Sequence, residues 1–349
     1  MKLQHAWVAV CVTASAILAA GHTASAGSVF IQGPHLVSMS FKEALPTDYA
    51  MKSLTFDGVN YWSVSGQVSG KKGFARYDAA GGLIPRTPTD NYYTYPDTQD
   101  FFSLAAGPGT YNTGILGDPD RNFVYARDAF TNKIYQLTYG STVGWTFAAT
   151  SLTLAPPGAP TDMRYSQFIL NDTGTEWYAH GPFRFSANTS GGLIYRWSNR
   201  QDTPGEWPGK YLGAVQLDPY GLLTGEKQSP AGHRMAVMGD CWLTFAGGNS
   251  GLTAGTLSAW DHSGNLVDRT LLTLPTGFSF TDESYWSMSY TNGKFWFLAN
   301  LPTARPQDGY DTSGDYWLGY TVIPEPATML AMGMGVAGLV RYGRRRLAV

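Results

Sequence analysis

The chain has 349 residues, 24 of them basic and 26 acidic, and a formal net charge of −2 at pH 7. Aromatic residues and charged residues each make up 14 % of it, and so many aromatics with so few charges exclude an intrinsically disordered chain. The near-neutral charge also argues against nucleic acid or an anionic membrane surface as a partner.

The first 26 residues predict a secretory signal peptide. Lys2 gives a charged start, residues 7–20 are mostly apolar, and Ala24 and Ala26 are the small residues at positions −3 and −1 of a cleavage site. We expect signal peptidase to cut after Ala26. A buried N-terminal helix is the less favoured alternative, because the segment has no amphipathic period.

Residues 27–323 predict an all-β domain. Short aromatic-rich runs of alternating polarity are separated by Asp-Gly, Asn-Gly and Gly-Gly turns, and long helical periodicities are absent. Such runs and turns are typical of antiparallel sheets.

The strand pattern repeats five times along this domain. The runs FARYD, IYQL, IYRW, LSAWD and WLGY align, and two of them continue into the similar turns YDAAGGLI and WDHSGNLV. A second series of aromatic runs lies upstream in each unit, beginning at Tyr61, Phe123, Trp177, Cys241 and Phe295. The fourth residues of the first series are 60, 60, 63 and 60 positions apart: Tyr77, Leu137, Trp197, Trp260 and Tyr320.

Five units of about 60 residues predict a five-bladed β-propeller with long connecting loops. Each small sheet has two apolar faces, so the sheets must stack on one another and the aromatic pairs would fill the layers between them. We expect residues 29–39 to supply a closing strand to the last blade. One or two β-sandwiches are the rival architecture.

Four aspartates fall at similar places in successive units: Asp57, Asp120, Asp172 and Asp240. On a propeller they would lie around one rim, where a pair of carboxylates could cleave a glycosidic bond. Each of them also has Gly, Pro or Asn close by in a turn, and aspartate is preferred in turns for backbone reasons alone. The second interpretation is the favoured one.

Calcium is a weaker possibility for two acidic segments, residues 118–122 and 308–315. Alternating oxygen ligands suit this ion, but Arg121 interrupts the first segment and neither segment offers a bidentate glutamate at the twelfth position. We expect no cofactor.

Several aromatic residues lie in Gly-, Pro- and Asp-rich stretches that predict loops. Exposed aromatic planes stack on sugar rings, so these residues are candidates for a glycan-binding surface, although packing of the loops' own interior is the favoured interpretation. The main candidates are Trp145, Trp207 and Tyr310, and the others are Tyr92, Tyr93 and Tyr95.

The C-terminal residues 324–349 have three parts. Pro324, Glu325 and Pro326 come first, and residues 327–340 form an apolar run of 14 residues. As a helix the run would be roughly 21 Å long against a hydrocarbon core of about 30 Å, which is short for a membrane span. The basic cluster that follows lets the ends snorkel and favours a cytoplasmic C-terminus. The cluster, within residues 341–346, consists of Arg341, Arg344, Arg345 and Arg346.

This tail resembles the PEP-CTERM sorting signal. The resemblance implies a Gram-negative bacterium that makes exopolysaccharide, in which an exosortase recognises the Pro-Glu-Pro region and removes the tail. A plain C-terminal membrane anchor is the alternative. Without both terminal segments the basic residues fall from 24 to 19 and the acidic ones from 26 to 25, so the net charge would be near −6.

These features predict an exported surface or matrix protein, inner-membrane anchored before tail removal and outside the cell after it. We expect it to be non-enzymatic and to bind exopolysaccharide through loop aromatics, because the chain has no HExxH, GxSxG or P-loop pattern. A glycan-cleaving enzyme that uses the rim aspartates is the alternative.

Overall fold

The structure is a computed structural model. It describes residues 29–31, 35–46, 51–68, 71–107, 123–155, 166–171, 173–181, 193–200, 204–205, 207–217, 235–246, 252–281, 284–285 and 287–322. The predicted signal peptide, residues 1–26, and the apolar run and basic cluster of the tail lie outside these ranges. Within them, no helix is long and apolar enough to cross a membrane.

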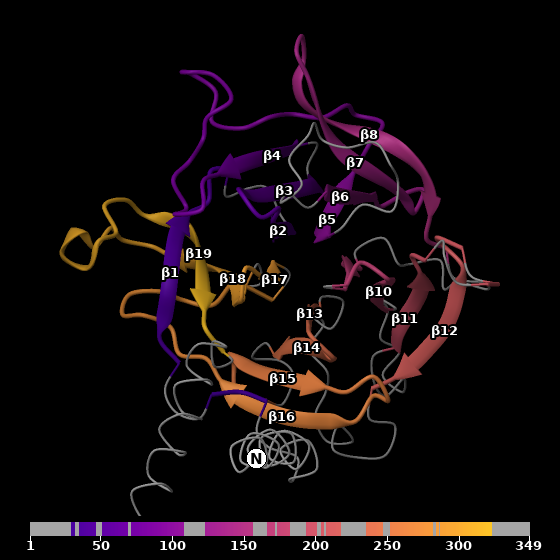
Figure 1. Cartoon of the computed structure of the whole chain (residues 1–349). Coiled ribbons are helices and arrows are strands. Elements are labelled where there is room, and N and C mark those ends of the chain that lie inside the picture. The colour runs from indigo at the N-terminus through magenta and orange to yellow at the C-terminus, as the bar shows by residue number, and fades with distance from the viewer. Residues whose placement is uncertain are drawn as a thin grey trace, which may run out of the picture.

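Five antiparallel sheets stand around a common centre, and we number them blades 1 to 5 in chain order (Figure 1). In blades 1 to 4 the chain starts at the innermost strand and moves outward. Blade 1 comprises β2 (Lys52–Phe56), β3 (Tyr61–Val68) and β4 (Lys71–Tyr77); blade 2 comprises β5 (Phe101–Gly107), β6 (Phe123–Asp128), β7 (Lys133–Gly140) and β8 (Gly144–Thr153). Blade 3 comprises β9 (Phe168–Leu170), β10 (Glu176–Gly181), β11 (Leu193–Ser198) and β12 (Tyr211–Gln216); blade 4 comprises β13 (Ala236–Met238), β14 (Cys241–Ala246), β15 (Thr256–Trp260) and β16 (Leu266–Leu271).

Blade 5 is built from both ends of the described chain. Its strands β17 (Met288–Thr291), β18 (Lys294–Leu301) and β19 (Gly314–Tyr320) are followed outward by β1 (Val37–Lys42), which pairs antiparallel with β19. Upstream of β1, the Ile31 amide also donates to the Val322 carbonyl at 2.9 Å. The prediction of a closing strand is confirmed, although the strand itself lies at the end of residues 29–39 and runs three residues beyond it.

The fivefold repeat is confirmed strand by strand. The positions spaced by about 60 residues all lie in the third strand of a blade, and the upstream aromatic series lies in the second. The two series face each other in register, as in the pairs Tyr61↔Tyr77, Trp177↔Trp197, Trp242↔Trp260 and Phe295↔Tyr320.

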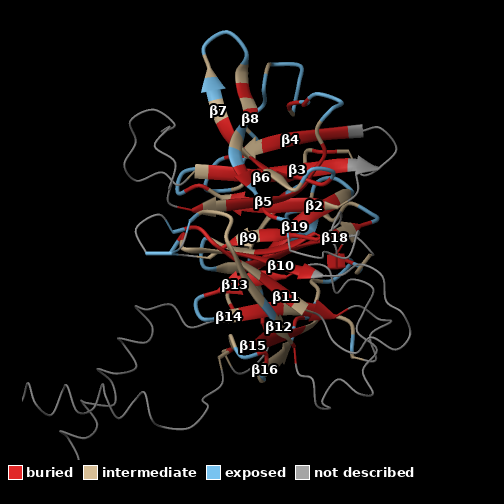
Figure 2. Ribbon diagram, turned by 90° about the vertical axis from the view of Figure 1, so that its right-hand side faces the viewer, coloured by how far each residue is buried: buried red, intermediate tan, exposed pale blue. Residues whose placement is uncertain are grey.

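The core is divided into five apolar clusters, and each cluster lies between two neighbouring blades. This arrangement rules out the β-sandwich alternative, in which two sheets would share one core. Figure 2 shows the buried residues within the strands and the exposed ones at the turns and at the tip of the β7–β8 hairpin. Each interface has an aromatic contact of about the same centroid distance: Phe74–Phe147 (5.1 Å), Tyr125–Trp177 (5.5 Å), Tyr178–Trp242 (5.6 Å), Phe245–Phe297 (4.8 Å) and Tyr61–Trp296 (5.2 Å).

Blade 1 departs from the others because its sheet has three strands among the residues that the structure describes. The turn YDAAGGLI, which matches WDHSGNLV before β16, leads here only to an isolated bridge between Tyr77 and Leu83. Tyr93 then bridges Phe74 and stacks on its ring at 4.8 Å. A Cβ at Gly73 would lie 2.6 Å from the Tyr93 carbonyl oxygen, so only glycine lets this segment cover the edge of the blade.

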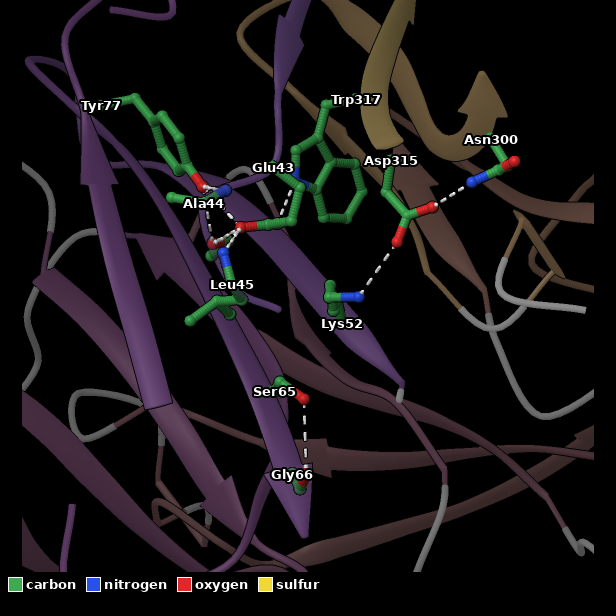
Figure 3. Close-up of polar contacts among 11 residues, drawn as sticks. Glu43, Ala44, Leu45, Lys52, Ser65, Gly66, Tyr77, Asn300, Asp315 and Trp317 are labelled. Carbon is green, nitrogen blue, oxygen red and sulfur yellow. Dashed lines mark hydrogen bonds and ion pairs between the residues drawn. The ribbon is translucent and has the colours of Figure 1, made fainter. Parts of the chain in front are cut away.

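Buried polar side chains join blade 5 to blade 1 (Figure 3). The Glu43 carboxylate, directly after β1, accepts hydrogen bonds from Trp317 Nε1 of β19 at 2.5 Å and from the Tyr77 hydroxyl of β4 at 2.5 Å. Beside it, Lys52 of β2 lies 3.6 Å from the Asp315 carboxylate of β19. A buried carboxylate needs such donors, so Glu43 holds β1 and β19 of blade 5 against β4 of blade 1.

Candidate functional site

Asp57 is committed to the turn between β2 and β3. Its Oδ1 accepts hydrogen bonds from the amides of Val59 (2.8 Å) and Asn60 (2.7 Å), and its Oδ2 accepts one from Trp62 Nε1 at 2.8 Å. The side chain is buried, with 1 % of its surface exposed. The interpretation of this aspartate as a turn former is therefore confirmed.

Asp240 occupies the equivalent turn between β13 and β14 and is exposed. Asp120 and Asp172 lie outside the described residues. Two of the four predicted rim positions thus follow strand 1 of their blades, as the repeat requires.

The aromatic candidates separate into buried and accessible groups. The prediction that Trp145 lies in a loop is wrong. It belongs to β8, where it faces Tyr139 across the hairpin and packs edge-on against Trp62 at 4.8 Å. Only 8 % of it is exposed, and Tyr93 and Tyr95 are buried as well. The Gly-rich turn that suggested a loop is the tip of the β7–β8 hairpin, and the residue after it already belongs to the strand.

Trp207 and Tyr310 remain accessible. Trp207 has 58 % of its surface exposed, and Lys210 Nζ lies 5.2 Å from its ring centroid. Tyr310 is half-buried, and its ring is held edge-on by Phe278 at 4.8 Å and Tyr316 at 5.3 Å. These contacts fix the tyrosine without covering it completely.

Tyr310 lines a groove of about 730 Å³ beside β1, at the outer edge of blade 5. Its hydroxyl lies 3.4 Å from Ser40 Oγ of that strand. Arg305, which pairs with the Asp308 carboxylate at 2.6 Å, supplies further polar groups. The groove therefore combines an aromatic ring with hydroxyl, guanidinium and carboxylate groups; its lining includes His35, Ser38, Ser40, Thr273, Arg305 and Tyr310.

His35 ties the start of this groove to blade 4. Its Nε2 lies 2.6 Å from Thr270 Oγ1 of β16, and its backbone bridges Leu272. Burial lowers the pKa of His35 below its ordinary value of 6.5, and a hydrogen bond with the backbone of Thr321 opposes the shift. A neutral imidazole thus joins the segment that leads into β1 of blade 5 to blade 4.

The acidic segment 308–315 engages protein cations. Asp308 binds Arg305, while Asp315 lies against Lys52 and accepts a hydrogen bond from Asn300 Nδ2 at 2.9 Å. Among the described residues no three His, Cys, Asp or Glu side chains gather as metal ligands. Segment 118–122 lies outside the described residues.

The polar junction around Glu43 was missed by sequence reasoning. Glu43 and Trp317 are 274 positions apart, and neither stands in a motif. The sequence shows only a glutamate directly after the closing strand. A glutamate in such a position is ordinarily exposed to solvent, so nothing marked this one as buried.

Comparison with known proteins gives one match to a family model: residues 322–346 match the PEP-CTERM protein-sorting motif. A comparison with curated protein sequences finds no match.

Solved structures with a similar course of the chain include Raptor of Chaetomium thermophilum, at 9 % identity and a TM-score of 0.36 over 83 % of this chain and 30 % of that one. A GH43_12 protein from a capybara gut metagenome matches at 13 % identity and a TM-score of 0.34, over 83 % of this chain and 54 % of that one. SapL1 lectin in complex with alpha methyl fucoside matches at 12 % identity and a TM-score of 0.33, over 81 % of this chain and 98 % of that one.

The chain spans less than a third of the Raptor chain, and all three scores are too low to say anything about activity. What the comparison and the fold establish together is a five-bladed β-propeller that carries a PEP-CTERM protein-sorting motif at its C-terminal end.

Proposed function

We propose that this protein is an exported surface or matrix component of a Gram-negative bacterium. Signal peptidase cuts after Ala26, and the apolar run 327–340 holds the precursor in the inner membrane with the basic cluster on the cytoplasmic side. An exosortase then removes the tail near Pro324–Pro326 and releases the propeller, residues 27–323. The PEP-CTERM motif at residues 322–346 is the observation that supports this route.

Mapping of both termini of the mature protein tests the route. We expect an N-terminus at Gly27 and a C-terminus near Pro324 in an exosortase-positive host, and an intact tail when the exosortase gene is deleted. Recovery of peptides containing Arg344, Arg345 and Arg346 from the surface fraction of the positive host would refute processing.

At its destination the propeller binds exopolysaccharide without cleaving it. The outer groove beside β1 supports this part of the proposal, because Tyr310 offers a ring that can stack on a sugar, and serine hydroxyls, Arg305 and Asp308 surround it. The exposed Trp207 offers a second stacking surface. We leave Trp145 out, since its ring is covered by Trp62.

Retention of the purified protein on the host's own exopolysaccharide tests this role. Tyr310→Ala and Trp207→Ala should each weaken retention, whereas Phe130→Ala, which removes an equally exposed ring in the β6–β7 turn, should not. Tyr310→Phe keeps the ring and should retain most of the binding. Equal retention of all four variants would contradict the proposal.

The same incubation tests the enzymatic alternative. Release of reducing ends that Asp240→Asn abolishes without unfolding the protein would establish a glycan-cleaving enzyme. Asp57 is the weaker candidate for such a role, because its carboxylate already accepts two hydrogen bonds from amides of its own turn and one from Trp62 Nε1 of β3.

A further inference from the structure

The described chain leaves the ring on one particular side. In four blades a residue at or next to the start of the second strand pairs with one at or next to the end of the third: Tyr61↔Tyr77, Trp177↔Trp197, Trp242↔Trp260 and Phe295↔Tyr320. The turns between first and second strands therefore lie on the same side as the ends of the third strands, and we call this side the turn face. Val322 comes two residues after the end of β19, so the tail starts at the turn face.

Val322 is firmly held in the fold. Its side chain is 0 % exposed in the apolar cluster between blades 4 and 5, and its carbonyl accepts the hydrogen bond from the Ile31 amide at 2.9 Å. Directly before it, Thr321 Oγ1 lies 3.2 Å from Ser38 Oγ of β1. The chain cannot come away here without breaking contacts of blade 5, so the reach of the tail is counted from Val322.

The distance from Val322 to the apolar run is short. Residues 323–326 separate it from residues 327–340, and five steps between successive Cα atoms reach at most roughly 18 Å in any conformation. Because the run is shorter than the hydrocarbon core, a spanning run begins at the edge of that core or below it. The headgroup layer takes up about 5–7 Å of the reach, so Val322 lies within roughly 11–13 Å of the headgroup surface.

The turn face also carries exposed apolar side chains. Val59, in the turn between β2 and β3, is 42 % exposed. β7 continues past the start of β6 into the β7–β8 hairpin, whose tip carries Tyr139 and Val143 with 50 % and 64 % of their surfaces exposed (Figure 2). Tyrosine and aliphatic side chains are favourable at the boundary between headgroups and acyl chains, so these residues suit contact with a lipid surface.

We propose that the turn face of the anchored precursor lies against the phospholipid headgroups and that removal of the tail exposes it. This inference rests on the proposed function, because it needs the apolar run to anchor the precursor. It adds which side of the propeller faces the membrane, and therefore which surface becomes accessible at release.

Cysteine labelling of the precursor in lipid nanodiscs tests this orientation. The precursor is purified from an exosortase-deleted host, after removal of the signal peptide with its Cys11, and is reconstituted with phosphatidylethanolamine and phosphatidylglycerol. Single cysteines replace Val59, Val143 or Phe130 in a Cys241→Ser background, and a polyethylene-glycol maleimide measures their accessibility. Phe130 is the control on the opposite side, because it lies in the turn between the second and third strands of blade 2 and is 59 % exposed.

Val59→Cys and Val143→Cys should react several-fold more slowly in nanodiscs than in the mature protein from an exosortase-positive host, and Phe130→Cys should react equally in both. A matched variant keeps the anchor and lengthens the tether by about 15 Gly and Ser residues between Ile323 and Pro324, which adds up to roughly 50 Å of reach. It should restore the reaction at Val59→Cys and Val143→Cys to the rate of the mature protein. Near-ultraviolet circular dichroism should show the same fold in all variants.

Equal labelling of Val59→Cys with the short and the long tether would overturn the orientation, while co-migration of the protein with the nanodiscs would leave the anchoring step standing. Protection of Leu271→Cys, at the outer edge of blade 4, with Val59→Cys accessible would also overturn it, since the flank of the ring would then meet the lipid. A precursor that does not co-migrate with the nanodiscs would refute the anchoring step and the orientation together.

Discussion

At the residue scale, Asp57 shows how one side chain can stabilise a turn and the core beneath it. Asp57→Ala removes the acceptor of two turn amides and leaves the buried Trp62 N–H without its partner. We expect a loss of about 2–4 kcal/mol in the free energy of unfolding, measured by urea denaturation. Asp240→Ala, in the exposed equivalent turn, should stay within about 0.5 kcal/mol. Equal effects at both positions would show that burial does not distinguish these turns.

Trp260 tests the packing between blades 3 and 4. Its ring is 2 % exposed within the cluster that contains Tyr178 and Trp242, and its Nε1 donates to Thr244 Oγ1 at 2.8 Å. Trp260→Ala should lower the free energy of unfolding by about 3–5 kcal/mol. Chemical denaturation of this variant and of Trp207→Ala checks the prediction. Replacing the exposed Trp207 should lower the free energy of unfolding far less. A small effect at Trp260 would mean that the interface can collapse around the missing ring.

Individual residues were predicted well where local chemistry decides and poorly where distant partners decide. The turn function of Asp57 follows from its neighbours in sequence, because an aspartate next to glycine accepts bonds from nearby amides. The burial of Trp145 depends on Trp62 in another blade, more than 80 positions away in the sequence. No local pattern contains that information.

At the element scale, the closing strand β1 connects the ends of the ring. Phe41 of this strand packs against Tyr61 (5.5 Å), Tyr77 (4.8 Å) and Trp296 (5.4 Å), so it touches blades 1 and 5 together. Phe41→Ala should cost about 3–5 kcal/mol, read from the shift of the urea midpoint.

Leu36→Ala is the control for this change, because Leu36 lies directly before β1 and is 77 % exposed. It should leave the midpoint within error. If Phe41→Ala were equally silent, β1 would be only loosely held and the ring would be stable without its closing strand.

The second and third strands of the blades were predictable because they are long enough to show their aromatic repeat. The inner strands β9 and β13 have only three residues each, too few for any period to appear. The outer strands β12 and β16 are half-buried along most of their length and lack the alternation that marks a strand with one apolar face. In the described part of the chain blade 1 has no fourth strand, and its YDAAGGLI turn gave no sign of this difference.

At the scale of the whole molecule, acid should weaken the joint between blades 4 and 5. Burial lowers the pKa of His35 in the folded protein, so the unfolded chain binds a proton more readily below pH 6.5. Stability contributed by the neutral imidazole is complete above that pH and is lost as the pH falls toward the lower, folded-state pKa.

Unfolding free energies of the natural protein and His35→Gln, measured between pH 7.5 and 5, check this sign. The natural protein should lose more stability than the variant over this range, and carboxylates elsewhere affect both proteins alike. A steeper loss in His35→Gln would mean that the folded protein holds the charged imidazole.

The blade number was predictable because a closed ring repeats one interface five times, and the spacing of the aromatic residues follows that repetition. The outer groove was not predictable from the sequence, because it combines residues from distant segments. The groove joins residues 35–40 to residues 273–276 and to Arg305, Asp308 and Tyr310.

The pairing of β1 with β19 also means that the ring can close only after β19 has been synthesised. Ser38 and Gly319, which contact each other across this pair, are 281 positions apart, so the first strand waits for nearly the whole chain to be translated. The sorting motif begins at residue 322, two residues after β19 ends. A chain broken off before β19 can neither complete blade 5 nor carry the address, and it would stay open. Ring closure therefore requires almost the same length of translated chain as the sorting motif does.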